Sequence, residues 1–213
     1  RNEIDAAYRH EVSLAYDARR LSAADVAGVT PGLDGRAITP QGAIFNPGEG
    51  WVDLPTLIGL LLKEFSALGG VLVTEQGAAR VLVEGGRAVG AETAKGGRFL
   101  ANAVVLATGP AVPRMAAENG QTIGDGTPVA LLVQTRPLAH PLRAVLNTPR
   151  VAVRPAPGGS FSLDADWAAD EGVRLRADGG YNIDEAVVDA LLTEAAKVME
   201  GNPKLEVASI GVG

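Results

Sequence analysis

The chain has 213 residues, of which 46% are hydrophobic, with a formal net charge of −6 and no cysteine. This length suits one large domain or two small ones, with about 70% of the unfolded chain's surface buried on folding. The acidic balance and the lack of a Lys/Arg run argue against a nucleic-acid partner. Without cysteine there can be no disulfide, thiolate zinc site or cysteine nucleophile in this stretch, which fits a reducing, cytoplasmic compartment.

The two ends of the chain look interrupted. No apolar run approaches the roughly 20 residues of a membrane helix, and no secretory signal opens the chain. The first residue is Arg1 rather than Met, and the last is Gly213 after an apolar run. We therefore expect a piece of a longer protein.

Helical and turn patterns alternate over the first 70 residues. Residues 3–18 predict a weak helix, Ser22 with Asp25 resembles a capping box, and residues 43–45 predict a short strand. The clearest helix is predicted over residues 53–68, with Asp53 as its N-cap, Pro55 in its first turn and Gly69-Gly70 at its end. Its apolar stripe recurs at helical spacing: Leu54, Leu57, Ile58, Leu61, Leu62, Phe65 and Leu68.

Strands dominate the next part. A buried strand, a three-stranded meander and a second buried strand are predicted at residues 71–74, 79–84, 87–93, 98–100 and 103–107. Strands at 129–134, 150–154 and 160–163, a helix at 184–199 capped by Asp184, and a strand at 205–210 complete the pattern.

The stretch ANAVVLATGP at residues 101–110 carries the first chemical hint. In open α/β sheets, ligands bind beyond the carboxyl ends of the strands. A strand that ends in Ala107-Thr108-Gly109 has little side-chain bulk there, so a ligand could approach the backbone, and Pro110 stops the ladder. An ordinary turn explains the same residues.

Two longer stretches, GEGWVDLPTLIGLLLKEFSALGGVLV and ARVLVEGGRAVGAETAKGGRFLANAVVLATG, resemble the D-amino-acid oxidase-like FAD-dependent oxidoreductases, which include glycine and sarcosine oxidases and amino-acid dehydrogenases. PGLDGRAITPQGAIFNP resembles the family's segment before that helix, and RVAVRPAPGGSFSLDAD resembles its substrate-domain hairpin. The resemblance covers most of residues 20–213 and rests on the order and spacing of these motifs.

The resemblance implies an α/β fold with an α+β substrate part. A partial FAD-binding, Rossmann-like layer is expected over residues 49–118. A mostly antiparallel substrate-binding sheet flanked by helices is expected over residues 1–48 and 119–206, with residues 207–213 as a strand returning to the FAD-binding part.

The resemblance also implies a reaction: oxidation of the C–N bond of an amino acid or related amine by hydride transfer to FAD. Val81 sits where the family's backbone holds adenine, and Ala107, Thr108 and Gly109 sit where the chain passes the FAD. A core position explains Val81 equally well. The family's Gly-x-Gly-x-x-Gly turn is expected before Arg1 and its Arg-Pro carboxylate anchor after Gly213, so we expect no catalysis by this chain alone.

Arg154 and Trp51 are the candidates for the substrate side. A guanidinium offers a bidentate fork to a carboxylate, but the sequence favours the other interpretation of Arg154, a strand-end arginine that faces solvent before a turn. Arg136 and Arg143 share this ambiguity. Trp51 either lines the site or packs over the start of the helix at 53–68.

Other site chemistries lack support. The acidic cluster around Asp164 has neither the glycine nor the glutamate of a calcium loop, so no metal is expected. His10 and His140 are far apart, and serine-hydrolase and P-loop motifs are absent.

Two rival functions stay open. One is the FAD domain of another flavoprotein class, of the succinate/fumarate or disulfide-reductase type. The other is a non-enzymatic α/β binding module. The sequence also leaves open the substrate, covalent attachment of the flavin, contact with a peripheral membrane surface or an electron acceptor, and the oligomeric state.

Overall fold

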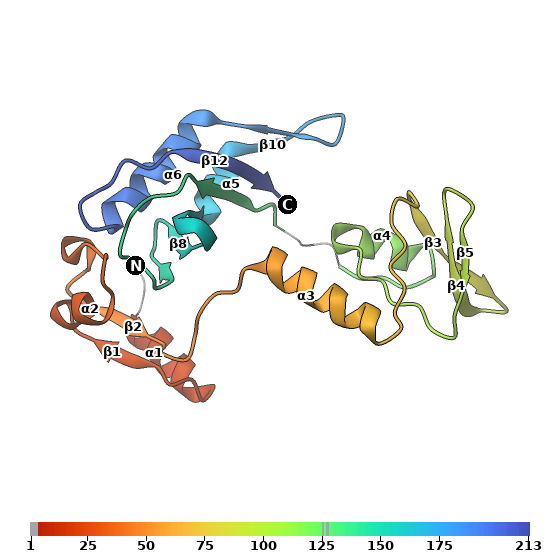
Figure 1. Cartoon of the computed structure of the whole chain (residues 1–213), viewed down its shortest axis with the longest axis horizontal. Coiled ribbons are helices and arrows are strands. Elements are labelled where there is room, and N and C mark those ends of the chain that lie inside the picture. Colours follow the sequence, from red (N-terminus) through yellow and green to blue (C-terminus); the bar gives the residue numbers. More distant parts are fainter. Residues whose placement is uncertain (1–3, 125, 127) are drawn as a thin grey trace. The chain divides into compact units, whose positions relative to one another are not determined.

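The computed structural model describes residues 4–124, 126 and 128–213 (Figure 1). The chain divides into two compact units, one formed by Arg1–Leu54 with Val129–Gly213 and the other by Pro55–Pro128. Among the described residues, no helix is long and apolar enough to cross a membrane.

The first unit is built around a five-stranded antiparallel sheet of order β12-β6-β9-β8-β7. Its strands are β6 (Leu131–Thr135), β7 (Leu146–Asn147), β8 (Ala152–Pro155), β9 (Phe161–Asp164) and β12 (Val207–Val212). The predicted strands at 129–134, 150–154, 160–163 and 205–210 are confirmed within a few residues, and β7 was not predicted. The last strand differs from its expected role, because β12 pairs with β6 in this sheet instead of returning to the other unit.

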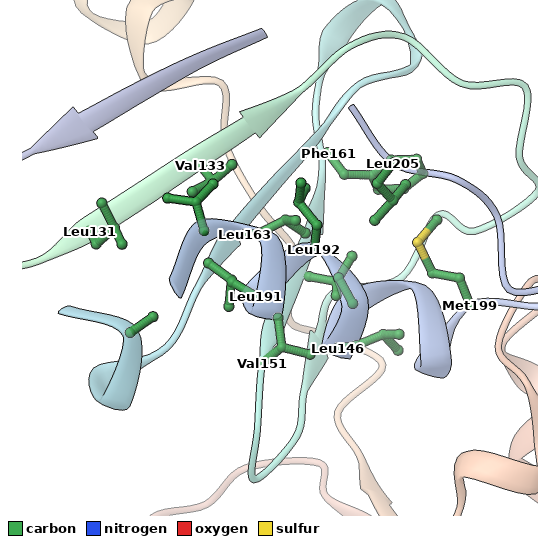
Figure 2. Packing of buried hydrophobic residues seen from close by; sticks show 14 of the residues in the cluster. Leu131, Val133, Leu146, Val151, Phe161, Leu163, Leu191, Leu192, Met199 and Leu205 are labelled. Atoms are coloured by element: carbon green, nitrogen blue, oxygen red, sulfur yellow. The ribbon is translucent and has the colours of Figure 1, made fainter. Parts of the chain in front are cut away.

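Two helices, α5 (Asp166–Gly172) and α6 (Glu185–Val198), bury one face of this sheet. The helix predicted at 184–199 is confirmed, and the Asp184 carboxylate accepts a hydrogen bond of 2.9 Å from the Ala186 amide as its cap. Figure 2 shows labelled side chains from β6, β9 and α6 pointing toward one another. Val133, Leu163 and Leu191 have no exposed surface, so this layer is the hydrophobic core of the unit.

Shorter elements complete the first unit: α1 (Ile4–Ser13), β1 (Arg19–Leu21), α2 (Ala23–Val29), η1 (Gly35–Ala37), β2 (Ala43–Phe45), η3 (Pro157–Gly159), β10 (Val173–Leu175) and β11 (Tyr181–Ile183). β1 pairs with β2 and β10 with β11, each antiparallel. The predicted cap of α2 is confirmed, because the Ser22 hydroxyl accepts a hydrogen bond from the Asp25 amide.

The second unit holds nearly all of α3 (Leu54–Ala67), then β3 (Ala79–Glu84), β4 (Arg87–Thr93), β5 (Arg98–Leu100), η2 (Gly109–Ala111) and α4 (Val112–Ala117). β3, β4 and β5 form an antiparallel meander with the predicted bounds. α3 is confirmed as a helix, but none of its residues is buried.

The two predicted buried strands of this unit are wrong. Residues 71–74 and 103–107 form no ladder with another strand, and Val71 and Val105 are 78% and 86% exposed. A strand exists only when a neighbouring strand accepts and donates its hydrogen bonds. The described residues of this unit supply no such neighbour, so the β-prone apolar pattern alone does not produce the strands.

Candidate functional site

Val81 lies on β3, the edge strand of the three-stranded meander. The Ala94 amide donates to the Ala78 carbonyl at 2.8 Å, which fixes the phase of the ladder between β3 and β4. Ladder bonds in an antiparallel pair fall on alternate residues, here Ala78, Arg80 and Leu82. The amide and carbonyl of Val81 therefore point away from β4, toward the outer edge of the sheet.

The predicted turn Ala107-Thr108-Gly109 is exposed, and Thr108 is the N-cap residue of η2. The Thr108 hydroxyl donates to the Met115 sulfur at 3.3 Å. Gly109 has a φ of +56°, in the left-handed region that favours glycine. Apart from its two chain neighbours, no residue has an atom within 4 Å of where a β-carbon of Gly109 would stand, so its backbone is accessible from that side.

The five-stranded sheet of the first unit has a polar face opposite the core. Its register aligns Gln134 on β6 with Ser162 on β9, and Ser162 with Arg154 on β8. Side chains alternate between the faces of a strand, and the sequence neighbours Val133 and Leu163 are fully buried. Gln134, Ser162 and Arg154 therefore form one row across three strands, which we call the polar row.

Hydrogen bonds order one end of the polar row. The Gln134 amide nitrogen donates to the Ser160 hydroxyl at 2.7 Å, and the Ser162 hydroxyl donates to the Gln134 carbonyl oxygen at 2.6 Å. The Ser160 hydroxyl also donates to the Pro157 carbonyl at 3.3 Å, which leaves it as the acceptor for the Gln134 amide nitrogen. The side chains at this end are therefore held in place by one another.

Arg154 occupies the other end of the polar row, beside Asp164. Its Nη2 forms an ion pair with Asp164 Oδ1, and the two side chains are 41% and 38% exposed. Its Nε is buried and has no hydrogen-bond partner. A buried donor without a partner is costly, and this atom has no accessible surface. A ligand can therefore reach Arg154 only through the exposed part of its side chain.

The structure does not bring the other candidates into this row. Trp51 is 42% exposed in the irregular segment before α3. Arg143 donates to the carbonyls of His140 and Leu142, at 2.6 and 2.8 Å, which explains it as a loop anchor. Arg136 is exposed, and its backbone amide bonds to the Glu206 carbonyl.

The histidine and acidic candidates have structural explanations. His140 Nδ1 accepts from the Leu142 amide at 3.2 Å, and its Nε2 lies 3.1 Å from the Glu200 carbonyl, which it contacts as donor in that tautomer. Asp164 pairs with Arg154, and Asp166 begins α5. No group of three or more metal-ligating side chains occurs among the described residues.

The most perturbed carboxyl group lies elsewhere, beside a hollow of about 580 Å³ lined by residues 31–36, Pro141 and Glu200 among others. Hydrogen bonds from the Arg36 guanidinium, and then from its backbone amide, lower the pKa of Asp34 to about 2. Asp34 is only 9% exposed and receives both Nε and Nη2 of Arg36. This pair holds a loop together and leaves no unpaired charge for a ligand.

Sequence reasoning singled out Arg154 but missed Gln134 and Ser162. The alternation of polar and buried residues along a strand could have identified both. Gln134 and Ser162 each lie between two apolar or buried residues in a strand. Asp164 was considered only as a calcium ligand, and its role beside Arg154 depends on the register of β8 and β9.

A family model described as "FAD dependent oxidoreductase" (DAO) matches residues 1–212. The fold is shared with a glycine oxidase from Geobacillus kaustophilus, at a TM-score of 0.69 and 20% identity over 98% of this chain and 54% of that one. It is also shared with an L-proline dehydrogenase from P. horikoshii, at a TM-score of 0.74 and 13% identity. That match covers 100% of this chain and 57% of the dehydrogenase.

An L-amino acid deaminase from Proteus myxofaciens is similar too, with a TM-score of 0.72 and 14% identity over 98% of this chain and 58% of that one. The chain thus spans a little over half the length of these solved structures. A search among curated proteins found no match. Because the family model covers almost the whole chain, the chain belongs to the DAO family of FAD-dependent oxidoreductases, whose cofactor is FAD.

Proposed function

We propose that the protein carrying this chain oxidises the C–N bond of an amino acid or a related amine. The names of the similar structures support this substrate class, since they include a glycine oxidase, an L-proline dehydrogenase and an L-amino acid deaminase. FAD, when bound, supplies the acceptor for the hydride that leaves the substrate. The role of the protein is then to bind and orient the substrate and the cofactor.

Arg154 is the observation that carries the substrate assignment. Its Nη2 is held by Asp164, and its side chain is 41% exposed on the polar face of the sheet. A guanidinium with free donors recognises a carboxylate by charge-assisted hydrogen bonds. We assign Arg154 to the substrate carboxylate, with Gln134 and Ser162 as the ordered polar surface beside it. Trp51 lies outside the polar row, and its role as a lining residue stays a prediction.

The cofactor assignment uses backbone groups. The outward amide and carbonyl of Val81 offer one donor and one acceptor, which is what the edge of an adenine ring requires. Ala107, Thr108 and Gly109 offer a turn with little side-chain bulk, where a flat ring can approach the backbone. Both features fit a dinucleotide held without a charged side chain at these positions.

The test uses the protein that carries residues 1–213. It is purified, supplied with FAD and examined for the two visible flavin absorption bands. Glycine, sarcosine, proline and several D-amino acids are then added without oxygen, each beside its methyl ester. We expect at least one amino acid to bleach the flavin and its ester to do so less well, since the ester lacks the carboxylate. A protein that takes up no FAD, or a flavin that no amine bleaches, would refute the proposal.

A further inference from the structure

Among the described residues at paired positions on the polar face of the five-stranded sheet, Arg154 and Asp164 are the only charged ones. The other paired positions of this face hold Leu132, Gln134, Asn147, Ala152, Ser162, Ser209 and Gly211. A ligand lying over these paired positions therefore meets one positive and one negative side chain. The Asp164 carboxylate forms a direct ion pair with the Arg154 guanidinium.

The two charges act differently on carboxylate ligands. Arg154 attracts the first carboxylate of a ligand, because its guanidinium is positively charged and its side chain is 41% exposed. Asp164 repels a second carboxylate brought close to the same guanidinium. With its side chain 38% exposed, water screens this repulsion without abolishing it.

We propose that Asp164 determines the specificity of this face, restricting it to ligands with a single carboxylate and excluding dicarboxylates. The inference rests on the assignment of Arg154 to a carboxylate made in the proposed function. We take a separation of about 7 Å between the Asp164 carboxylate and the second carboxylate of the ligand. With an effective dielectric constant between the value for a protein surface and the value for bulk water, this repulsion weakens binding by about 5- to 10-fold. Asp164 thus narrows the amino acids accepted to those without an acidic side chain.

The test compares two ligands that differ by one carboxylate. Propionate carries one, and succinate is propionate extended by a second. Their dissociation constants are measured by calorimetry on the FAD-loaded protein that carries residues 1–213. The wild type is expected to bind propionate about 5- to 10-fold more tightly than succinate. Asp164→Asn keeps an oxygen acceptor for Arg154 and should bring the ratio close to one.

Two further variants serve as controls. Asp164→Glu restores the carboxylate and should restore the preference. Asp178→Asn removes the charge from another arginine–aspartate pair, Arg176 with Asp178 between β10 and β11, and should leave the preference unchanged. Unfolding midpoints measured by circular dichroism identify any variant that has lost its fold, and the comparison is then made with the folded ones.

The outcomes separate this inference from the proposed function. A wild type without the preference, a preference that survives in Asp164→Asn, or a failure to bind either ligand would overturn the role of Asp164, even if amino acids bleach the flavin. A preference that disappears in Asp164→Asn supports the role, even if no amine bleaches the flavin and the proposed reaction falls.

Discussion

Replacing Leu163 by Ala tests whether the core beneath the polar row is packed as the structure shows. Leu163 has no exposed surface and lies on β9 between Ser162 and Asp164, whose side chains point to the other face. Truncating a fully buried leucine costs the transfer of its lost carbons plus the cavity left behind, about 3 kcal/mol within a usual range of about 2–5. The unfolding equilibrium constant should then rise on the order of 100-fold.

The assay is urea unfolding followed by the fluorescence of Trp167. Only two tryptophans occur in the chain, so a Trp51→Phe background isolates this signal. Trp167 reports on the same unit, because its ring packs 4.3 Å from the Arg150 guanidinium and its Nε1 donates to the Arg150 carbonyl. Leu175→Ala is the control, since that side chain is 71% exposed and should lose less than about 0.5 kcal/mol. Equal losses for both variants, or a loss under about 1 kcal/mol for Leu163→Ala, would refute this packing.

Two other perturbations test the loop that packs against residues 198–200. Gly32 has a φ of +88°, and an added β-carbon would stand 2.5 Å from the Leu142 amide nitrogen. Gly32→Ala should therefore lower the free energy of unfolding, measured by urea titration, by about 1–3 kcal/mol. An unchanged urea midpoint would contradict this. Asp34 has its pKa lowered from 3.8 to about 2, so its stabilisation is complete above pH 3.8 and disappears as the pH falls toward 2. Between pH 5 and 2, the midpoint temperature of thermal unfolding should therefore fall more steeply in the wild type than in Asp34→Asn. Midpoint curves that run parallel for the two proteins would contradict this.

Local patterns predicted much of the fold. The meander of β3, β4 and β5 follows from two glycine turns between alternating strands, and α6 follows from the Asp184 cap and an unbroken apolar stripe. Both signals lie within short stretches of sequence. The strands predicted at 71–74 and 103–107 failed because a strand depends on a neighbour that no local pattern reports.

The candidate site was predicted in part for the same reason. Arg154 and Gly109 carry a chemical signal of their own, as a fork for carboxylates and as a residue free to adopt positive φ. The polar row does not exist until the register aligns Gln134, Ser162 and Arg154. The pairing of Arg154 with Asp164 likewise joins residues ten positions apart through a hairpin.

The most direct test of the central claim is the rate of anaerobic flavin reduction against amino-acid concentration, for the wild type and for Arg154→Gln. If Arg154 binds the substrate carboxylate, losing its charge should raise the apparent dissociation constant by about 10-fold or more, with a limiting rate that changes far less. Arg176→Gln, an exposed arginine paired with Asp178, should match the wild type. An unchanged dissociation constant in Arg154→Gln, or a wild-type flavin that no amino acid reduces, would contradict the claim.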